Sequence, residues 1–212
     1  MAACLVMVVM VRLSHPTAQV LIDRVLARID GAPLTLTDVE AAIGLGVVQG
    51  PLDGGMQQMI NRLLELTEVQ RFPPPEPSPA AIAAEAARLK MNAGTRLQPL
   101  MQSTGLTDQR ITDIARDNVR IAAYLEQRFG TTVQVSDEEV ANYYRTHEAE
   151  FTRGGDALSF DEAEAIARQR LSAERRRAII DQWLADLRNR ADVDINKEQE
   201  PPPTTYQPQP RQ

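Results

Sequence analysis

Residues 135–151, with the sequence VSDEEVANYYRTHEAEF, decide the fold of this chain. Ser136 and Glu139 have the spacing of a capping box, in which each side chain binds a backbone N–H at the start of a helix. Aromatic side chains then recur at helical spacing, and we expect them to anchor this helix against the last helix of the chain. Only residues 152–159 intervene before that next helix begins. The recurring side chains are Tyr143, Tyr144, His147 and Phe151.

Caps and apolar stripes predict that most of the remaining chain is α-helical as well. Thr37 with Glu40, and Ser159 with Glu162, have capping-box spacing. Pro79 suits a first helical turn, where its missing N–H costs nothing. We expect helices to begin at Thr37, about residue 55, Ser78, about residue 95, Thr107 and Ser159. The helix that begins at Thr107 would end at Gly130, and the helix that begins at Ser159 would end near residue 190. In the helix that begins at Thr107, the expected core-facing stripe includes Ala122, Leu125 and Phe129. In the helix that begins at Ser159, it includes Ala178, Trp183 and Leu187.

Two short segments near the ends of the chain alternate in the manner of β-strands. Residues 25–29 (VLARI) are followed by the turn signal Asp30-Gly31, and residues 192–195 (DVDI) alternate in the same way. Because an isolated two-stranded ribbon is marginally stable, we expect the two segments to pair and to lie on the helices. The predicted fold is therefore mainly α, a multi-helix domain with a long C-terminal helix and a short two-stranded β pairing of the N- and C-terminal segments.

Proline runs and an apolar leader divide the chain. Residues 1–18 contain an apolar run too short to span a bilayer as a helix, and we expect a secretory signal peptide, with an uncleaved N-terminal membrane anchor as the alternative. Residues 19–196 would form the helical domain, in which residues 73–79 are a stiff proline-rich linker. Residues 197–212 would be a disordered proline-rich tail. Removal of the signal would also remove Cys4, the single cysteine, which suits an oxidising compartment.

Composition argues against several classes of function. The net charge is −6 and the pI about 5.1, whereas binding nucleic acid needs a basic surface. Beyond residue 18 the histidine is His147 alone and cysteine is lacking, so a cysteine nucleophile or a His/Cys zinc cluster cannot be built there. We interpret His147 as a half-exposed helical residue that caps or forms a salt bridge. Acidic residues such as Asp137 fall at helix starts, where they meet the helix dipole favourably. We expect no catalytic residues, no metal and no cofactor.

A run of arginines on the last expected helix is interleaved with acidic residues. We interpret this run as a solvated face with i,i+4 ion pairs. The alternative is weak association with an anionic membrane surface or with an acidic client. The run comprises Arg168, Arg170, Arg175, Arg176 and Arg177.

The order of these segments resembles the N-terminal chaperone domain of the SurA/PrsA-type peptidyl-prolyl isomerases of the bacterial cell envelope. LIDRVLARIDGAPLTLTDVEAAI is similar to the family's opening strand, turn and helix, and MQQMINRLLELTEVQRF to its second helix. GLTDQRITDIARDNVRIAAYLEQRF is similar to the helix before the segment quoted first, and SFDEAEAIARQRLSAERRRAIIDQWLADLRNRADVDI to the closing helix and strand. Together these cover most of residues 20–196. The parvulin isomerase domain of the family is missing, because residues 152–159 are too few to form it.

The resemblance implies an ATP-independent chaperone, or holdase, of the periplasm or cell envelope. It would bind unfolded or partly folded secreted and outer-membrane proteins in an apolar helical cleft, and methionines suit such a cleft because they repack around varied partners. Two alternatives stay open: isomerase activity retained without the parvulin domain, and a dedicated assembly subunit that binds one partner. Exchange of the last helix between two copies would give a homodimer. The candidate peptide-binding residues are Met56, Met59, Leu63, Met91, Leu97 and Met101.

Overall fold

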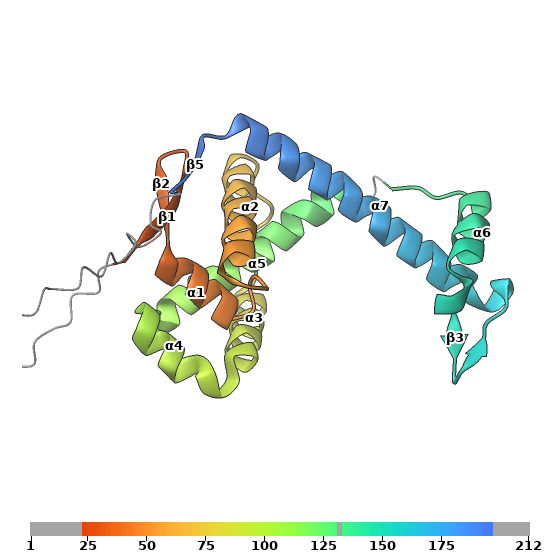
Figure 1. The fold of residues 1–212 in the computed structure, drawn as a ribbon, viewed down its shortest axis with the longest axis horizontal. Helices are drawn as coiled ribbons and strands as arrows, with labels where there is room; N and C mark the ends of the chain where they lie inside the picture. The colour runs from red at the N-terminus through yellow and green to blue at the C-terminus, as the bar shows by residue number, and fades with distance from the viewer. Residues whose placement is uncertain (1–22, 131–132, 197–212) are drawn as a thin grey trace, which may run out of the picture.

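The computed structural model describes residues 23–130 and 133–196, which are mainly α-helical with a small antiparallel sheet. The expected signal peptide and proline-rich tail lie outside these residues. Two parts are joined by the long helix α7 (Figure 1). We call them the body (residues 23–129 and 179–196) and the distal lobe (residues 133–171). The helices are α1 (Leu36–Gly44), α2 (Leu52–Arg71), α3 (Pro79–Ala93), α4 (Leu97–Thr104), α5 (Asp108–Phe129), α6 (Asp137–Thr146) and α7 (Phe160–Arg190).

The two terminal segments pair as predicted, but within a three-stranded sheet. β1 (Val25–Ile29) lies between β2 (Ala32–Thr35) and β5 (Val193–Ile195) and is antiparallel to both. The prediction of two strands was wrong because the turn after β1 is a tight hairpin. Asp30 and Gly31 both have positive φ, 49° and 82°, which matches the twist of a two-residue hairpin loop.

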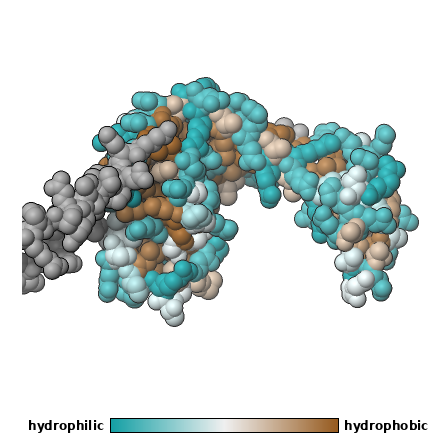
Figure 2. Space-filling model, viewed as in Figure 1, coloured by the Kyte–Doolittle hydropathy of each residue, from teal (hydrophilic) through white to brown (hydrophobic). Residues whose placement is uncertain are grey.

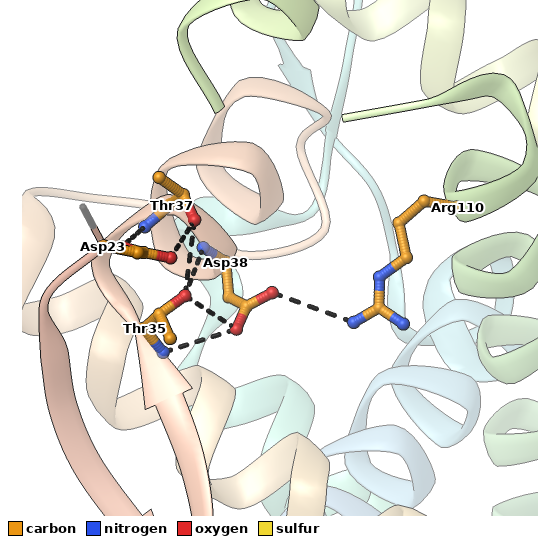
Figure 3. Close-up of polar contacts among 5 residues, drawn as sticks. All are labelled: Asp23, Thr35, Thr37, Asp38 and Arg110. Carbon is orange, nitrogen blue, oxygen red and sulfur yellow. Dashed lines mark hydrogen bonds and ion pairs between the residues drawn. The ribbon is translucent and has the colours of Figure 1, made fainter. Parts of the chain in front are cut away.

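Helix α1 is capped two residues earlier than predicted. Thr35 keeps extended backbone angles, its hydroxyl accepts from the N–H of Asp38, and the Asp38 carboxylate binds the N–H of Thr35 in return. The predicted capping box of Thr37 and Glu40 is wrong. Thr37 already lies in the first helical turn, and its hydroxyl donates to Asp23 instead (Figure 3).

Two cores hold the body together. The first lies between the sheet, α2, the end of α5 and the C-terminal half of α7, and it contains Trp183. The second lies between α1, α3, α4 and the first half of α5 and contains Leu89. Helix α3 begins at Ser78 and Pro79 as predicted, with the serine hydroxyl accepting from a backbone N–H. The proline-rich residues 73–78 before it form neither helix nor strand and connect α2 to α3.

Two residues predicted to face the core are exposed. In α5 the buried face includes Ile121 and Tyr124, so Ala122 beside them points to solvent. The larger side chains of Ile121 and Tyr124 are buried in place of Ala122, because the Tyr124 ring packs against Trp183, with ring centroids 5.9 Å apart. In α7, Ala178 is exposed because the middle of the helix lies between the two parts and is enclosed by neither (Figure 1).

The distal lobe has a small core of its own. Both capping boxes predicted here are present, at Ser136 for α6 and at Ser159 for α7. Between these helices the chain makes a hairpin of β3 (Thr152–Arg153) and β4 (Asp156–Ala157). The aromatic residues of α6, and Phe151 five residues beyond its end, pack on α7, as expected. The buried members of this core are Val140, Tyr143, Phe151, Leu158, Ala163 and Ala167.

Helix α7 acts as a strut between the two parts. Its 31 residues make it about 46 Å long, at 1.5 Å per residue. Its first turns bury Ala163 and Ala167 in the distal lobe, and its last turns bury Trp183 and Leu187 in the body. The space-filling view shows open space beneath the middle of the helix, so the molecule has the form of an arch (Figure 2).

Candidate functional site

The side chains expected to bind peptides do not gather in one place. Met59 and Leu63 of α2 line the same pocket. Met91 on α3 is 74 % exposed and lines no wall of that pocket. The others pack against the body cores, Met56 against the first and Leu97 and Met101 against the second.

The pocket that holds Met59 and Leu63 lies between α1, α2 and the first half of α5, and we call it the body pocket. Its volume is about 360 Å³. Mainly apolar walls interrupted by a few polar groups are the usual form of a small ligand site. Its aliphatic walls include Ala41, Val47, Met59, Leu63, Leu66 and Ile114, and its charged side chains are Asp38, Arg62, Arg110 and Asp117.

A chain of polar contacts lines the edge of the body pocket where β2 meets α1 (Figure 3). The Thr35 hydroxyl donates to Asp38 over 2.9 Å, and an Arg110 nitrogen lies 3.8 Å from the other Asp38 oxygen. Burial alone would raise the pKa of Asp23, but hydrogen bonds from the Thr37 hydroxyl and from the N–H groups of Thr37 and Arg24 outweigh it and lower that pKa. The Asp38–Arg110 pair is long and exposed, so it contributes little stability.

Three ionisable groups on α2 and α5 are partly withdrawn from water here. Burial lowers the pKa of the Arg62 guanidinium and raises the pKa of the Glu65 and Asp117 carboxyls. Arg62 donates one hydrogen bond, from Nη2 to the carbonyl oxygen of Ile114 over 3.3 Å. Among the described residues, neither Asp117 nor Glu65 accepts a hydrogen bond or forms an ion pair.

Arg62 also lines a more open hollow of about 500 Å³, whose other walls come mainly from α3 and α5. The acid that lines this hollow, Glu85, is already engaged. It accepts from Arg88 over 2.6 Å and from Asn118 over 2.6 Å, and the Arg88 bond is the main reason why the pKa of Glu85 is lowered. The guanidinium of Arg62 therefore keeps most of its donors for other partners.

A second candidate surface lies where the arch joins the body, and we call it the joint hollow. It has a volume of about 450 Å³ and is walled mostly by the middle of α7, including Ser172, Ala173 and Ile180. Gly130 at the end of α5 closes its other side. Arg176 on its rim pairs with Glu126 over 2.6 Å and so ties α7 to the end of α5.

The arginine run of α7 mainly clamps the distal lobe. Arg168 makes one i,i+4 pair of the expected kind, with Glu164 over 2.8 Å. Most acidic partners of the arginine run, however, belong to other elements. The interpretation of this run as a solvated face with i,i+4 pairs missed these partners. Besides the Arg176–Glu126 pair, the cross-element pairs are Arg168–Asp137 at 2.6 Å, Arg170–Glu150 at 3.3 Å and Arg175–Glu139 at 2.5 Å.

His147 caps a helix, as its position in the sequence indicated. It ends α6, its Nδ1 lies 2.9 Å from the carbonyl oxygen of Tyr143, and its ring stacks on the Tyr143 ring. The Tyr143 hydroxyl donates to Glu174, which raises the pKa of Tyr143 to about 12. Within residues 23–130 and 133–196 no cluster of acidic, histidine or cysteine side chains could hold a metal ion, and no helix has the length and apolarity needed to cross a membrane.

The charged residues of the body pocket were missed by reasoning from the sequence. Arg62 stands between Met59 and Leu63 and interrupts an apolar stripe. This interruption was the one sign in the sequence that a charged residue lines a pocket here. Asp117 and Arg110 lie about one turn of α5 after and before Ile114, respectively, and gave no comparable sign. Comparison with protein-family models, with curated proteins and with solved structures finds no match for this chain.

Proposed function

We propose that this protein is an ATP-independent holdase that shields unfolded secreted and outer-membrane proteins in the cell envelope. The observation that carries the proposal is the arch, in which two separately packed parts leave the middle of one helix open between them (Figure 2). A client segment lying under α7 would contact the joint hollow and be flanked by the body and the distal lobe. Such binding needs neither a nucleotide nor a catalytic group.

The chemistry of the joint hollow supports broad rather than selective binding. Its lining combines small or aliphatic residues with the polar Gln169 and Ser172 and with two arginines, Arg176 and Arg177. Apolar contact is non-directional, so it favours many partners about equally. Arginine adds donors for backbone carbonyls without demanding a particular sequence. The resemblance to envelope chaperones points to the same use, and no comparable feature favours isomerase activity.

The test is suppression of aggregation by residues 19–212, with a urea-unfolded outer-membrane protein diluted into buffer without ATP. We expect light scattering to fall with increasing dose. Ala173→Glu places a charge in the joint hollow and should weaken the suppression severalfold. Ala178→Glu is the matched control, because it adds the same charge to the same helix at an exposed position outside the hollow.

The holdase proposal fails if the protein leaves aggregation unchanged at a molar excess over the client. It also fails as a general mechanism if only one of several unrelated clients is protected, since that result would indicate a dedicated assembly subunit. If Ala173→Glu and Ala178→Glu weaken the suppression equally, the client surface does not lie in the joint hollow.

A further inference from the structure

We infer that the body pocket is an anchor site for one large apolar residue of an extended polypeptide, with Arg62 and Asp117 binding the main chain beside it. This inference rests on the proposed function and gives it a second, more selective contact. The partner is therefore defined by its chemistry, as an aliphatic or aromatic side chain flanked by a free carbonyl acceptor and a free N–H donor.

The size of the body pocket sets how much of a client it could take. About 360 Å³ lies near the lower end of the range for ligand pockets. That space suits one large side chain and the adjoining backbone, and it is too small for a folded element. Met59 and Leu63 face it from α2 and Ile114 from α5, so the side chain would be held by aliphatic contact on two sides.

Arg62 is the donor of the site. Its guanidinium has five N–H groups, and among the described residues it makes one hydrogen bond, of 3.3 Å, while the carboxylates of Asp117 and Glu65 attract it electrostatically. Its partial withdrawal from water lowers its pKa, so bulk solvent satisfies the remaining donors poorly. A main-chain carbonyl brought in by a ligand would pair with those donors at little further desolvation cost.

Asp117 is the acceptor of the site. It lines the same pocket, is half-buried, and accepts no hydrogen bond within the part of the chain that the structure describes. A main-chain N–H would satisfy it. The polypeptide backbone is the common biological group that presents a carbonyl and an N–H side by side, which matches this pair.

The charges of the pocket disfavour other occupants. A phosphate or another compact anion would meet Asp38 and Asp117 as well as Arg62 and Arg110, so attraction and repulsion offset each other. A wholly apolar small molecule would offer no hydrogen-bond partner to the remaining donors of Arg62 or to the Asp117 carboxylate and would leave both less hydrated, which is costly. An extended peptide avoids both penalties.

The first experiment follows the methionine methyl groups of the whole chain by NMR while a blocked tripeptide, acetyl-Ala-Leu-Ala-amide, is added. The Met59 methyl signal should shift on binding, whereas the signal of exposed Met91 should stay in place. Acetyl-Ala-Ala-Ala-amide should shift neither signal at the same concentration. A Met59 methyl signal that does not shift when the leucine peptide is added would overturn the proposed anchor site. This readout needs no substituted variant.

The second experiment tests the two polar contacts by substitution. Arg62→Met should raise the peptide Kd at least about tenfold, since a hydrogen bond to a charged group is lost. Arg96→Met, which removes an exposed arginine that lines none of the pockets described above, should leave the Kd unchanged. An ester analogue that lacks the leucine N–H should bind the wild-type protein more weakly but bind Asp117→Ala as well as the amide does. Equal amide and ester affinities for the wild-type protein would overturn the role of Asp117.

The same protein preparations should be used for aggregation suppression. Suppression together with a shift of Met59 that Arg62→Met abolishes supports both the holdase and the anchor. Suppression without any leucine-dependent shift refutes the anchor and leaves the holdase standing. Absence of both refutes both, so the two failures are distinguishable.

Discussion

The body and the distal lobe are stabilised by different means. The body has two cores, with thirteen and nine buried side chains in the part of the chain that the structure describes, whereas the distal lobe has six. Around its small core the distal lobe is held to α7 by ion pairs and by the bond from Tyr143 to Glu174. Because exposed ion pairs contribute little free energy, the lobe depends heavily on a few aromatic contacts.

The contrast also assigns roles to the two ends of α7. At Trp183 the helix completes a core that would be incomplete without it. At Ala163 and Ala167 it supplies a flat surface on which α6 and its aromatic residues pack. We therefore expect the body to unfold as one cooperative unit and the distal lobe to open separately, at lower free energy. Such a hierarchy would allow the arch to widen around clients of different size.

Phe151→Ala is the substitution expected to separate the two parts most clearly. Phe151 is 2 % exposed, its ring contacts Tyr144 at 5.4 Å between centroids, and Arg170 lies over its face at 4.9 Å. Its loss should cost about 3–5 kcal/mol locally. Amide hydrogen exchange should show α6 unprotected while α2 keeps its protection. The same loss of protection in α2 would mean that the arch folds as a single unit.

Ile60→Ala tests the body in the same way. Ile60 is fully buried in the first core, and its truncation should lower the free energy of unfolding by about 2–5 kcal/mol. The single tryptophan, Trp183, lies in that core, so its fluorescence in a urea titration reports the change directly. Thr67→Ala, on an exposed face of the same helix, is the control and should move the midpoint little. A small shift for Ile60→Ala would contradict the idea that the first core carries the body.

Removing one N-cap hydroxyl from each part compares the stabilities of the body and the distal lobe by the same kind of substitution. Thr35→Ala and Ser136→Ala each remove a capping hydroxyl and should each cost about 1 kcal/mol. In the body this is a minor fraction of the total, so the Trp183 transition should move slightly. In the distal lobe it should accelerate amide exchange of α6 severalfold to tenfold. Equal sensitivity of the two parts would show that their stabilities are alike.

The smallest expected effect is a pH dependence confined to the distal lobe. A hydrogen bond from Arg175, followed by the capping bonds at Ser136, lowers the pKa of Glu139 from 4.5 to about 2. The folded lobe therefore holds this proton less tightly than the unfolded chain does, so its contribution is present above about pH 4.5 and is lost as the pH falls towards 2. Exchange of α6 amides should accelerate over that interval, and Glu139→Gln should flatten the dependence. An unchanged profile in the variant would assign the acid sensitivity to other carboxylates.

Local signals in the sequence were sufficient for most helices. The caps at Ser78, Thr107, Ser136 and Ser159 were all predicted and are all present, because a capping bond needs only residues within one turn. The α1 cap was misplaced because Thr35 and Thr37 both have a suitable partner three residues later, Asp38 and Glu40. Asp23, fourteen residues before Thr37, decides between them by taking the Thr37 hydroxyl. Such a contact is not a local property of the helix.

The sequence by itself determined the helical content, most helix starts, the pairing of the two terminal segments and the contact of Tyr143, Tyr144 and Phe151 with α7. These follow from spacing of 3.6 or 2 residues and from short-range hydrogen bonds. The tertiary structure alone decided the arch, the third strand and the body pocket. Arg62 and Asp117 are 55 positions apart, and they share a pocket only because α2 and α5 pack side by side. Periodicity identifies which face of each helix is apolar, but the angle at which two such faces meet depends on how their side chains interlock.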